Sequence, residues 1–154
     1  SVVVGGTDHA LYEVAVSGRA ARKARTLYTK AHGHAEWVTC VAYCSGGRVL
    51  SGGMDSKLCL WDAKSARCSD LVAHRGSVAA VSVSADGEAA VSASYDKSLV
   101  LWSLAGGARA DKAGRDRARL DAHRAPVLCV DWAPGAARCA SGDRDGRLLV
   151  WDLE

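Results

Sequence analysis

The sequence predicts an all-β fold built from one small sheet repeated along the chain, and three observations support this prediction. Segments 51–61, 92–102 and 141–151 align without a gap, and each begins with serine and ends with tryptophan. In each segment an aspartate follows the serine by four residues, and a histidine lies 27 or 28 residues before the tryptophan. The tryptophans are 41 and 49 residues apart, a period typical of four-stranded repeat units.

Each repeat divides into three short strands between its histidine and its tryptophan. A glycine-containing turn follows the first strand, because glycine adopts the positive φ that a tight hairpin needs. The second strand ends at the serine, and a turn around the aspartate leads to the third strand. The third strands are almost entirely apolar, as expected of strands that are buried on both faces. The expected first strands are 38–41, 78–81 and 127–130, and the expected third strands are 58–61, 99–102 and 148–151.

The chain resembles the WD-repeat family, whose repeats begin with Gly-His and end with Trp-Asp. The matching dipeptides are 33–34, 61–62 and 151–152, whereas Ala73, Ala122 and Ser103 replace the glycine or the aspartate of the others. The resemblance covers residues 33–152. It implies a β-propeller, in which four-stranded blades stack around a central channel.

Residues 1–32 are expected to form the rear part of a degenerate blade. Aligning Asp8 with the aspartate of the turn places Val4 at the serine position and Val14 at the tryptophan position. The hydrogen-bonding side chains of the repeat are therefore absent from this blade. Its strands are expected at 1–5 and 10–16, with an outer strand at 25–29.

We expect an incomplete arc of about three and a half four-stranded blades, with about fourteen strands, whereas closed propellers usually have four to eight blades. Residues 33–72 are expected to form a WD blade, 73–121 a WD blade with a basic insert at about 104–119, and 122–154 a WD blade that lacks its last strand. The remaining blades would come from sequence outside this chain. A closed ring of four blades that borrows strands from a partner chain is the alternative.

Serine, histidine and aspartate recur together, but the sequence does not indicate a hydrolase. A catalytic triad needs one such set, with the serine on a strained turn beside an oxyanion hole. This chain has three sets and no Gly-x-Ser-x-Gly motif. The family resemblance implies a structural tetrad in which aspartate accepts from histidine, histidine contacts serine, and serine binds the tryptophan indole. The expected tetrads are His34, Ser51, Asp55 and Trp61; His74, Ser92, Asp96 and Trp102; and His123, Ser141, Asp145 and Trp151.

Six cysteines raise the alternatives of a disulfide scaffold, a metal site or buried free thiols. None forms a Cys-x-x-Cys pair, and most lie in apolar runs, so buried free thiols in a reducing, cytoplasmic compartment are expected. A metal site at His32 and His34 is not expected, because it would remove His34 from its tetrad. His9 and His32 lie outside the repeat register and are expected to be solvated. We therefore expect neither a metal nor another cofactor.

The composition also limits the classes of partner. No apolar run approaches the roughly 18 residues that span a bilayer, so no membrane segment is expected. A net charge of +3 is too small to indicate nucleic-acid binding. Other proteins, within a multi-subunit assembly, are the expected partners.

The resemblance places the expected partner-binding residues on the face called the top face in this family. Three side chains of each blade reach it: those three and five residues after the histidine, and the one just before the turn aspartate. Aromatic residues and arginine at such positions are typical of binding hot spots, and methionine suits an adaptable surface. The residues are Trp37, Thr39, Met54, Ser77, Ala79, Tyr95, Pro126, Leu128 and Arg144, and the degenerate blade adds Thr7.

Two basic segments are expected in loops on the opposite face. Their charge indicates either compositional drift or a contact for an acidic partner, such as an acidic protein tail or RNA. Segment 19–25 contributes Arg19, Arg22, Lys23 and Arg25, and segment 108–119 contributes Arg109, Lys112, Arg115, Arg117 and Arg119.

The sequence therefore predicts a non-catalytic platform for binding other proteins. One alternative is an architectural subunit of a microtubule-based or ciliary complex, located on the cytoskeleton, that contacts acidic partners through the basic loops. The other is an enzyme, which the threefold tetrads disfavour.

Overall fold

The computed structural model describes residues 1–17, 20–27, 33–62, 67–105 and 115–153, and fourteen strands lie in these segments. The strands form four antiparallel sheets, and each strand pairs with its neighbour in the sequence. Among the described residues, no helix has the length and the apolar character needed to cross a bilayer. The prediction of an all-β fold is confirmed.

The four sheets follow one another along the chain. Sheet 1 contains β1 (Val2–Gly5), β2 (Leu11–Ser17) and β3 (Ala20–Leu27). Sheet 2 contains β4 (Val38–Tyr43), β5 (Arg48–Gly53), β6 (Lys57–Asp62) and β7 (Arg67–Val72), with a short 3-10 helix at Ser45–Gly47. Sheet 3 contains β8 (Val78–Val83), β9 (Ala89–Ser94), β10 (Leu99–Ser103) and β11 (Arg115–Leu120). Sheet 4 contains β12 (Val127–Trp132), β13 (Arg138–Asp143) and β14 (Leu148–Asp152).

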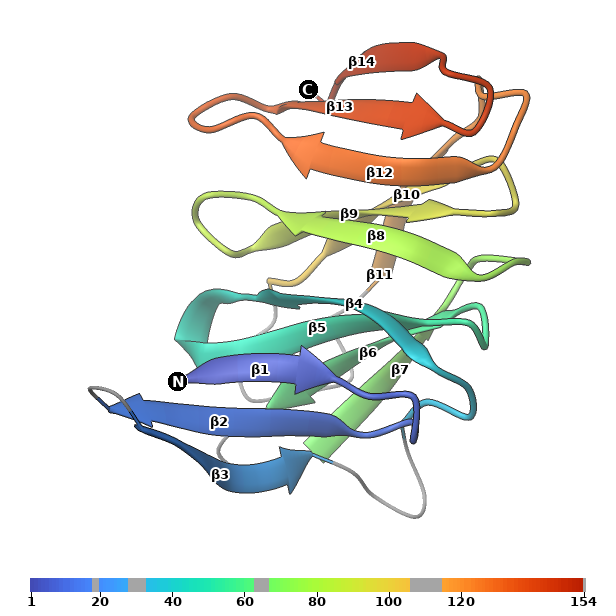
Figure 1. Ribbon diagram of the computed structural model, residues 1–154. Helices are drawn as coiled ribbons and strands as arrows, with labels where there is room; N and C mark the ends of the chain where they lie inside the picture. The colour runs from blue at the N-terminus through green and yellow to red at the C-terminus, as the bar shows by residue number, and fades with distance from the viewer. Residues whose placement is uncertain (18–19, 28–32, 63–66, 106–114, 154) are drawn as a thin grey trace.

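The sheets stack face to face as an arc, in the order of the sequence (Figure 1). The first strands of sheets 2, 3 and 4, which are β4, β8 and β12, contact one another in series, and β1 of sheet 1 contacts β4. This arrangement is that of consecutive propeller blades.

The hydrophobic core lies between the sheets. Trp61 packs with residues of sheet 1, and Trp102 packs with residues of sheet 2. Both tryptophans are fully buried, with relative exposures of 0% and 1%. On β6, Leu58 and Leu60 pack toward sheet 3, whereas Trp61 packs toward sheet 1. Because successive side chains of a strand point to opposite faces, one apolar strand supplies two interfaces, which explains its continuous apolar run.

The outer strands are longer than the sequence predicts, and this corrects the expected position of the basic segments. The outer strand of sheet 1 was expected at 25–29, but β3 begins at Ala20 and pairs with β2 as far as Ser17. The outer strand of sheet 3 begins at Arg115, inside the expected basic insert. Antiparallel backbone pairing with β2 and β10 extends the two outer strands over these basic residues. Arg22, Lys23, Arg25, Arg115, Arg117 and Arg119 therefore lie on strands and not in loops.

Candidate protein-binding face

In sheet 2, a chain of hydrogen bonds joins four side chains from three segments. His34 Nδ1 lies 3.0 Å from Asp55 Oδ1, and His34 Nε2 lies 2.8 Å from Ser51 Oγ. The indole N–H of Trp61 donates to Ser51 Oγ at 2.9 Å. The imidazole is fully buried, so each of these bonds satisfies a group that has no access to water.

Sheet 3 repeats the arrangement. His74 Nδ1 lies 3.1 Å from Asp96 Oδ2, His74 Nε2 lies 2.7 Å from Ser92 Oγ, and Trp102 donates to the same serine at 2.8 Å. Ser98, which the sequence did not single out, donates its hydroxyl to Asp96 Oδ1 at 2.6 Å and is fully buried. The expected hydrogen bonds of the first two tetrads are therefore present.

The third set differs from the expectation, because its acid is Asp143 and not Asp145. His123 Nδ1 lies 2.8 Å from Asp143 Oδ2, and His123 Nε2 lies 2.7 Å from Ser141 Oγ, to which Trp151 donates at 2.8 Å. Asp145 is exposed, whereas Asp143 is buried. The prediction of Asp145 as the tetrad acid was wrong.

The geometry of the turn explains this exchange. Gly53 occupies the position of Asp143 in sheet 2, and a Cβ placed there would lie 2.4 Å from His34 Nδ1. A side chain at this position therefore points at the histidine. The Asp143 side chain points toward His123 in this way. Its Oδ1 also accepts hydrogen bonds from the backbone amides of Asp145 and Arg147, at 3.1 and 3.0 Å. The presence of two acids in this turn, against one in the other two, was the signal in the sequence.

The buried histidines of sheets 2 and 3 differ in electrostatic environment. Burial lowers the pKa of His34, but the Asp55 carboxylate and the adjacent Cys59 outweigh it and raise the pKa to about 9. Burial also lowers the pKa of His74, and there it outweighs the opposing effect of Asp96. Burial raises the pKa of Asp96, but hydrogen bonds from Ser98 and from the Arg75 amide bring it below its usual value.

One backbone hydrogen bond recurs at the top of sheets 2, 3 and 4. Its donor is the backbone amide of the residue just before the predicted tetrad aspartate. Its acceptor is the carbonyl oxygen of the residue three positions after the tetrad histidine. The three bonds, each 2.9 Å long, are Met54 to Trp37, Tyr95 to Ser77, and Arg144 to Pro126. These bonds fix two of the three predicted top-face positions of each sheet side by side, so the backbone holds the surface in place while the side chains vary.

Several of the predicted top-face side chains are exposed. Trp37, Tyr95 and Met54 have relative exposures of 53%, 51% and 45%. Arg144 and Thr7 are also exposed, and Pro126 is half-buried. Trp37 therefore does not fill the interior of its own sheet.

Six of the predicted residues meet in one pocket of about 450 Å³. Thr39 and Ser77 hold its walls together across the sheet boundary: Thr39 Oγ1 lies 2.6 Å from the carbonyl oxygen of Val78, and Ser77 Oγ donates to the carbonyl of Met54 at 3.2 Å. Val78 is the one lining residue that the sequence did not single out, and it is fully buried. The lining residues are Thr39, Met54, Ser77, Val78, Ala79, Tyr95 and Leu128.

Two of the predicted basic residues, Arg25 and Arg119, form ion pairs. Arg25 Nε lies 3.0 Å from Glu13 Oε2. Arg119 reaches Asp121 Oδ1 at 3.1 Å and Asp96 Oδ2 at 3.2 Å, and it donates to the Ala73 carbonyl at 3.2 Å. Arg119 thus joins the network of the third sheet's tetrad at the top of β11, which corrects its expected place on the opposite face.

The other predicted basic residues have no described side-chain position. Arg19, Arg109 and Lys112 lie outside the described residues, and the side chains of Arg22, Lys23, Arg115 and Arg117 are not described. A continuous basic surface is therefore not part of the described structure.

The histidines and cysteines outside the tetrads have varied surroundings. His9 is half-buried, and its Nδ1 is buried without a hydrogen-bond partner, which corrects the expectation that it is solvated. His32 lies outside the described residues. All six cysteines are free thiols; Cys44, Cys59 and Cys139 are buried, Cys40 and Cys68 are half-buried, and Cys129 is exposed.

Comparison with known families agrees with this geometry. The profile described as WD domain, G-beta repeat, matches residues 25–62, 66–103 and 114–152. The chain belongs to the WD-repeat family. Proteins of this family generally serve as scaffolds for protein interactions, and they are typically not enzymes.

Three known proteins that this chain resembles have names that refer to different roles. Protein HIR1 of Kluyveromyces lactis is 27% identical over 148 residues, covering 79% of this chain and 17% of the relative. The ribosome biogenesis protein WDR12 homolog of Dictyostelium discoideum is 26% identical over 121 residues, covering 78% and 26%. The p21-activated protein kinase-interacting protein 1-like protein of Danio rerio is 35% identical over 72 residues, covering 46% and 20%. The chain therefore spans at most about a quarter of the length of these relatives.

Proposed function

We propose that this chain is a non-catalytic platform that binds a partner protein on its top face. The observation that carries the proposal is the pocket formed by residues of sheets 2, 3 and 4, whose lining comes almost entirely from side chains that the repeat register places on the top face. Met54, Tyr95 and Leu128 line the pocket with apolar surface that remains exposed to solvent. We infer that an apolar side chain of the partner enters it.

Trp37 and Arg144 extend the proposed surface beyond the pocket. Both side chains are exposed, and tryptophan, tyrosine and arginine are the residue types that dominate binding hot spots. The recurrent backbone bonds hold these side chains on a fixed frame, which reduces the ordering cost of binding. This pre-organisation favours a rigid docking surface over a flexible one.

The top face is preferred to the basic segments as the binding site. Arg25 and Arg119 already pair with acids of the same chain, so part of their charge is compensated. We therefore do not extend the proposal to a microtubule-based or ciliary role, which depended on a basic face. The free thiols fit a reducing compartment, in which we place this protein.

A displayed library of random peptides tests the proposal even though the partner protein is not identified. Peptides selected on the 154-residue chain should carry a recurrent apolar or aromatic residue. Tyr95→Ala and Met54→Ala should each weaken the selected peptides by about tenfold, because a hot-spot residue contributes more than about 1 kcal/mol. Isothermal titration calorimetry gives the affinities.

Tyr43→Ala is the matched control. Tyr43 and Tyr95 have similar exposures of 48% and 51%, but Tyr43 is the last residue of β4 and lies outside the pocket. Its replacement should leave the peptide affinity unchanged. Peptides that lose affinity equally with both tyrosine variants, or with neither, would contradict the proposal.

A further inference from the structure

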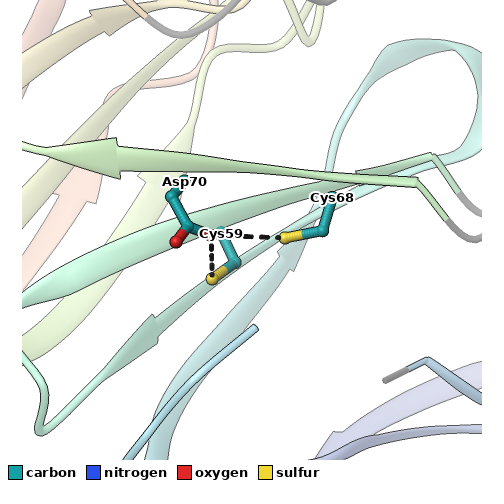
Figure 2. A group of neighbouring side chains, drawn as sticks. All are labelled: Cys59, Cys68 and Asp70. Atoms are coloured by element: carbon teal, nitrogen blue, oxygen red, sulfur yellow. Dashed lines mark hydrogen bonds between the residues drawn. The ribbon is translucent and has the colours of Figure 1, made fainter. Parts of the chain in front are cut away.

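The hairpin of β6 and β7 brings two cysteines and one aspartate together on one face of sheet 2. Cys59 on β6 is directly opposite Asp70 on β7, and Cys68 lies two residues before Asp70 on the same side. Both sulfurs point toward the Asp70 carboxylate (Figure 2). Their distances to Asp70 Oδ1 are 3.6 Å for Cys59 and 3.7 Å for Cys68. All three donor atoms lie within 4.8 Å of one another.

These distances fit the edges of a tetrahedral zinc site. With zinc–sulfur bonds of about 2.3 Å and zinc–oxygen bonds of about 2.0–2.2 Å, the sulfur–oxygen edge of the tetrahedron is about 3.6 Å. The three atoms therefore need little movement to share one ion. Two thiolates favour a soft or borderline cation, and the carboxylate favours zinc over a softer ion such as Cu(I).

A disulfide between the two cysteines fits the geometry less well. Trp61, and not Cys59, is opposite Cys68, so the two cysteines are diagonal neighbours across the strands. Diagonal Cα atoms are about 7–8 Å apart, whereas disulfides usually need about 4.4–6.8 Å. Bridging the two sulfurs would require the strands to shift.

The neighbouring residues orient the donor set. Lys57 Nζ lies 2.7 Å from Asp70 Oδ2, which leaves Oδ1 facing the sulfurs and supplies a positive charge beside three potential anions. A second partner of this kind commonly fixes a metal-binding carboxylate. Cys59 is buried, Cys68 is half-buried and Asp70 is exposed, so the cluster extends from the core to the protein surface.

The corresponding positions of the next two sheets lack this donor set. Cys59 pairs with the tetrad serine Ser51, and the residues that pair with the equivalent serines are Val100 in sheet 3 and Leu149 in sheet 4. The position of Asp70 in sheet 3 is Arg119, which pairs with Val100. The repeat therefore does not require two thiols and a carboxylate at these positions.

We propose that Cys59, Cys68 and Asp70 bind one zinc ion, with water as the fourth ligand. The sequence predicted no metal site because the cysteines form no Cys-x-x-Cys pair. The hairpin of β6 and β7 nevertheless brings Cys59 and Cys68, which are nine residues apart, close together in space. Each thiol gives up its proton when its sulfur coordinates the ion, so binding releases two protons to the buffer. The ion fastens the outer strand β7 to β6.

Cobalt(II) is the probe for this site, because cobalt bound to thiolates absorbs strongly in the near ultraviolet. The reduced, metal-free chain should bind one cobalt ion with this charge-transfer band, and zinc should displace it. Cys68→Ser and Asp70→Asn should weaken cobalt binding at least tenfold. Both residues lie on the outer strand, and neither belongs to the proposed pocket. Cys129→Ser, which removes an exposed thiol from sheet 4, is the matched control and should retain full binding.

The thermal melting temperature gives a second readout. Zinc should raise the melting temperature of the wild-type chain and of Cys129→Ser, but not that of Cys68→Ser. A folded wild-type chain without the charge-transfer band would overturn the proposal, as would a band of equal strength in Cys68→Ser.

Discussion

His123 Nδ1 lies 2.8 Å from Oδ2 of Asp143, inside the turn that ends β13. Both side chains are almost completely buried, at 0% and 1% exposure, so removal of the carboxylate leaves a buried ring nitrogen without a partner. Such a loss costs roughly 1–3 kcal/mol. Asp143→Ala should therefore lower the free energy of unfolding by about 1–3 kcal/mol in urea titrations.

Asp145→Ala is the control for that variant. Asp145 is exposed and Asp143 takes its place beside His123, so its loss should change the free energy of unfolding by less than about 0.5 kcal/mol. A larger loss from Asp145→Ala than from Asp143→Ala would show that the sheet uses the acid that the repeat register predicts.

The same turn contains a backbone position that depends on glycine. Gly146 has φ +83°, and a Cβ added to it would meet nothing within 4 Å. Gly146→Ala therefore tests backbone strain without a steric clash, and it should destabilise the chain by about 1 kcal/mol. Lys97, at the equivalent position of sheet 3, has φ +72°, so Lys97→Gly should not destabilise. Thermal unfolding gives the melting temperatures of both variants. Equal melting temperatures for the wild type and Gly146→Ala would refute the predicted backbone strain.

The lowered pKa of His74 predicts a loss of stability in mild acid. An unfolded histidine takes up a proton near pH 6.5, whereas buried His74 in the folded chain stays neutral to a lower pH. Below about pH 6.5 the unfolded state therefore binds more protons, and the free energy of unfolding falls as the pH falls. His74→Gln removes this group, so the slope of stability against pH should become shallower between about pH 6.5 and 5.

His34 separates this effect from a general response to acid. Its pKa is raised to about 9, so its stabilising contribution is complete below pH 6.5 and is lost as the pH rises through 9. Urea titrations at several pH values measure both windows. An unchanged acid slope in His74→Gln would contradict the assignment.

The exposed aromatic residues of the top face should contribute little to folding. Trp37 and Tyr95 are about half exposed, whereas Trp102 is buried and donates a hydrogen bond to Ser92. Trp37→Ala and Tyr95→Ala should each change the free energy of unfolding by less than about 0.5 kcal/mol, and Trp102→Ala should cost about 3–5 kcal/mol. A large loss of stability in Tyr95→Ala would mean that this side chain has a structural role.

The repeat spacing predicted the stacked sheets, and the resemblance to the WD-repeat family implied the hydrogen bonds that are present in the first two tetrads. The resemblance also assigned Trp37, Met54 and Tyr95 to the top face, and all three side chains are exposed. It failed at Asp143, since register alone does not give the direction of a side chain within a turn. It also missed the cluster of Cys59, Cys68 and Asp70, because strand pairing across a hairpin joins residues that are separated in the sequence.

The ε-methyl group of Met54 gives the most direct test of partner binding on the top face. Met54 is the only methionine of the sequence and lines the pocket, so methyl labelling of methionine places a single reporter there. Addition of a selected peptide should shift the Met54 methyl resonance along a saturation curve with the Kd measured by calorimetry. The same peptide added to Tyr95→Ala should shift it only at much higher concentration. A peptide that binds tightly by calorimetry and leaves the Met54 resonance unmoved would contradict the account.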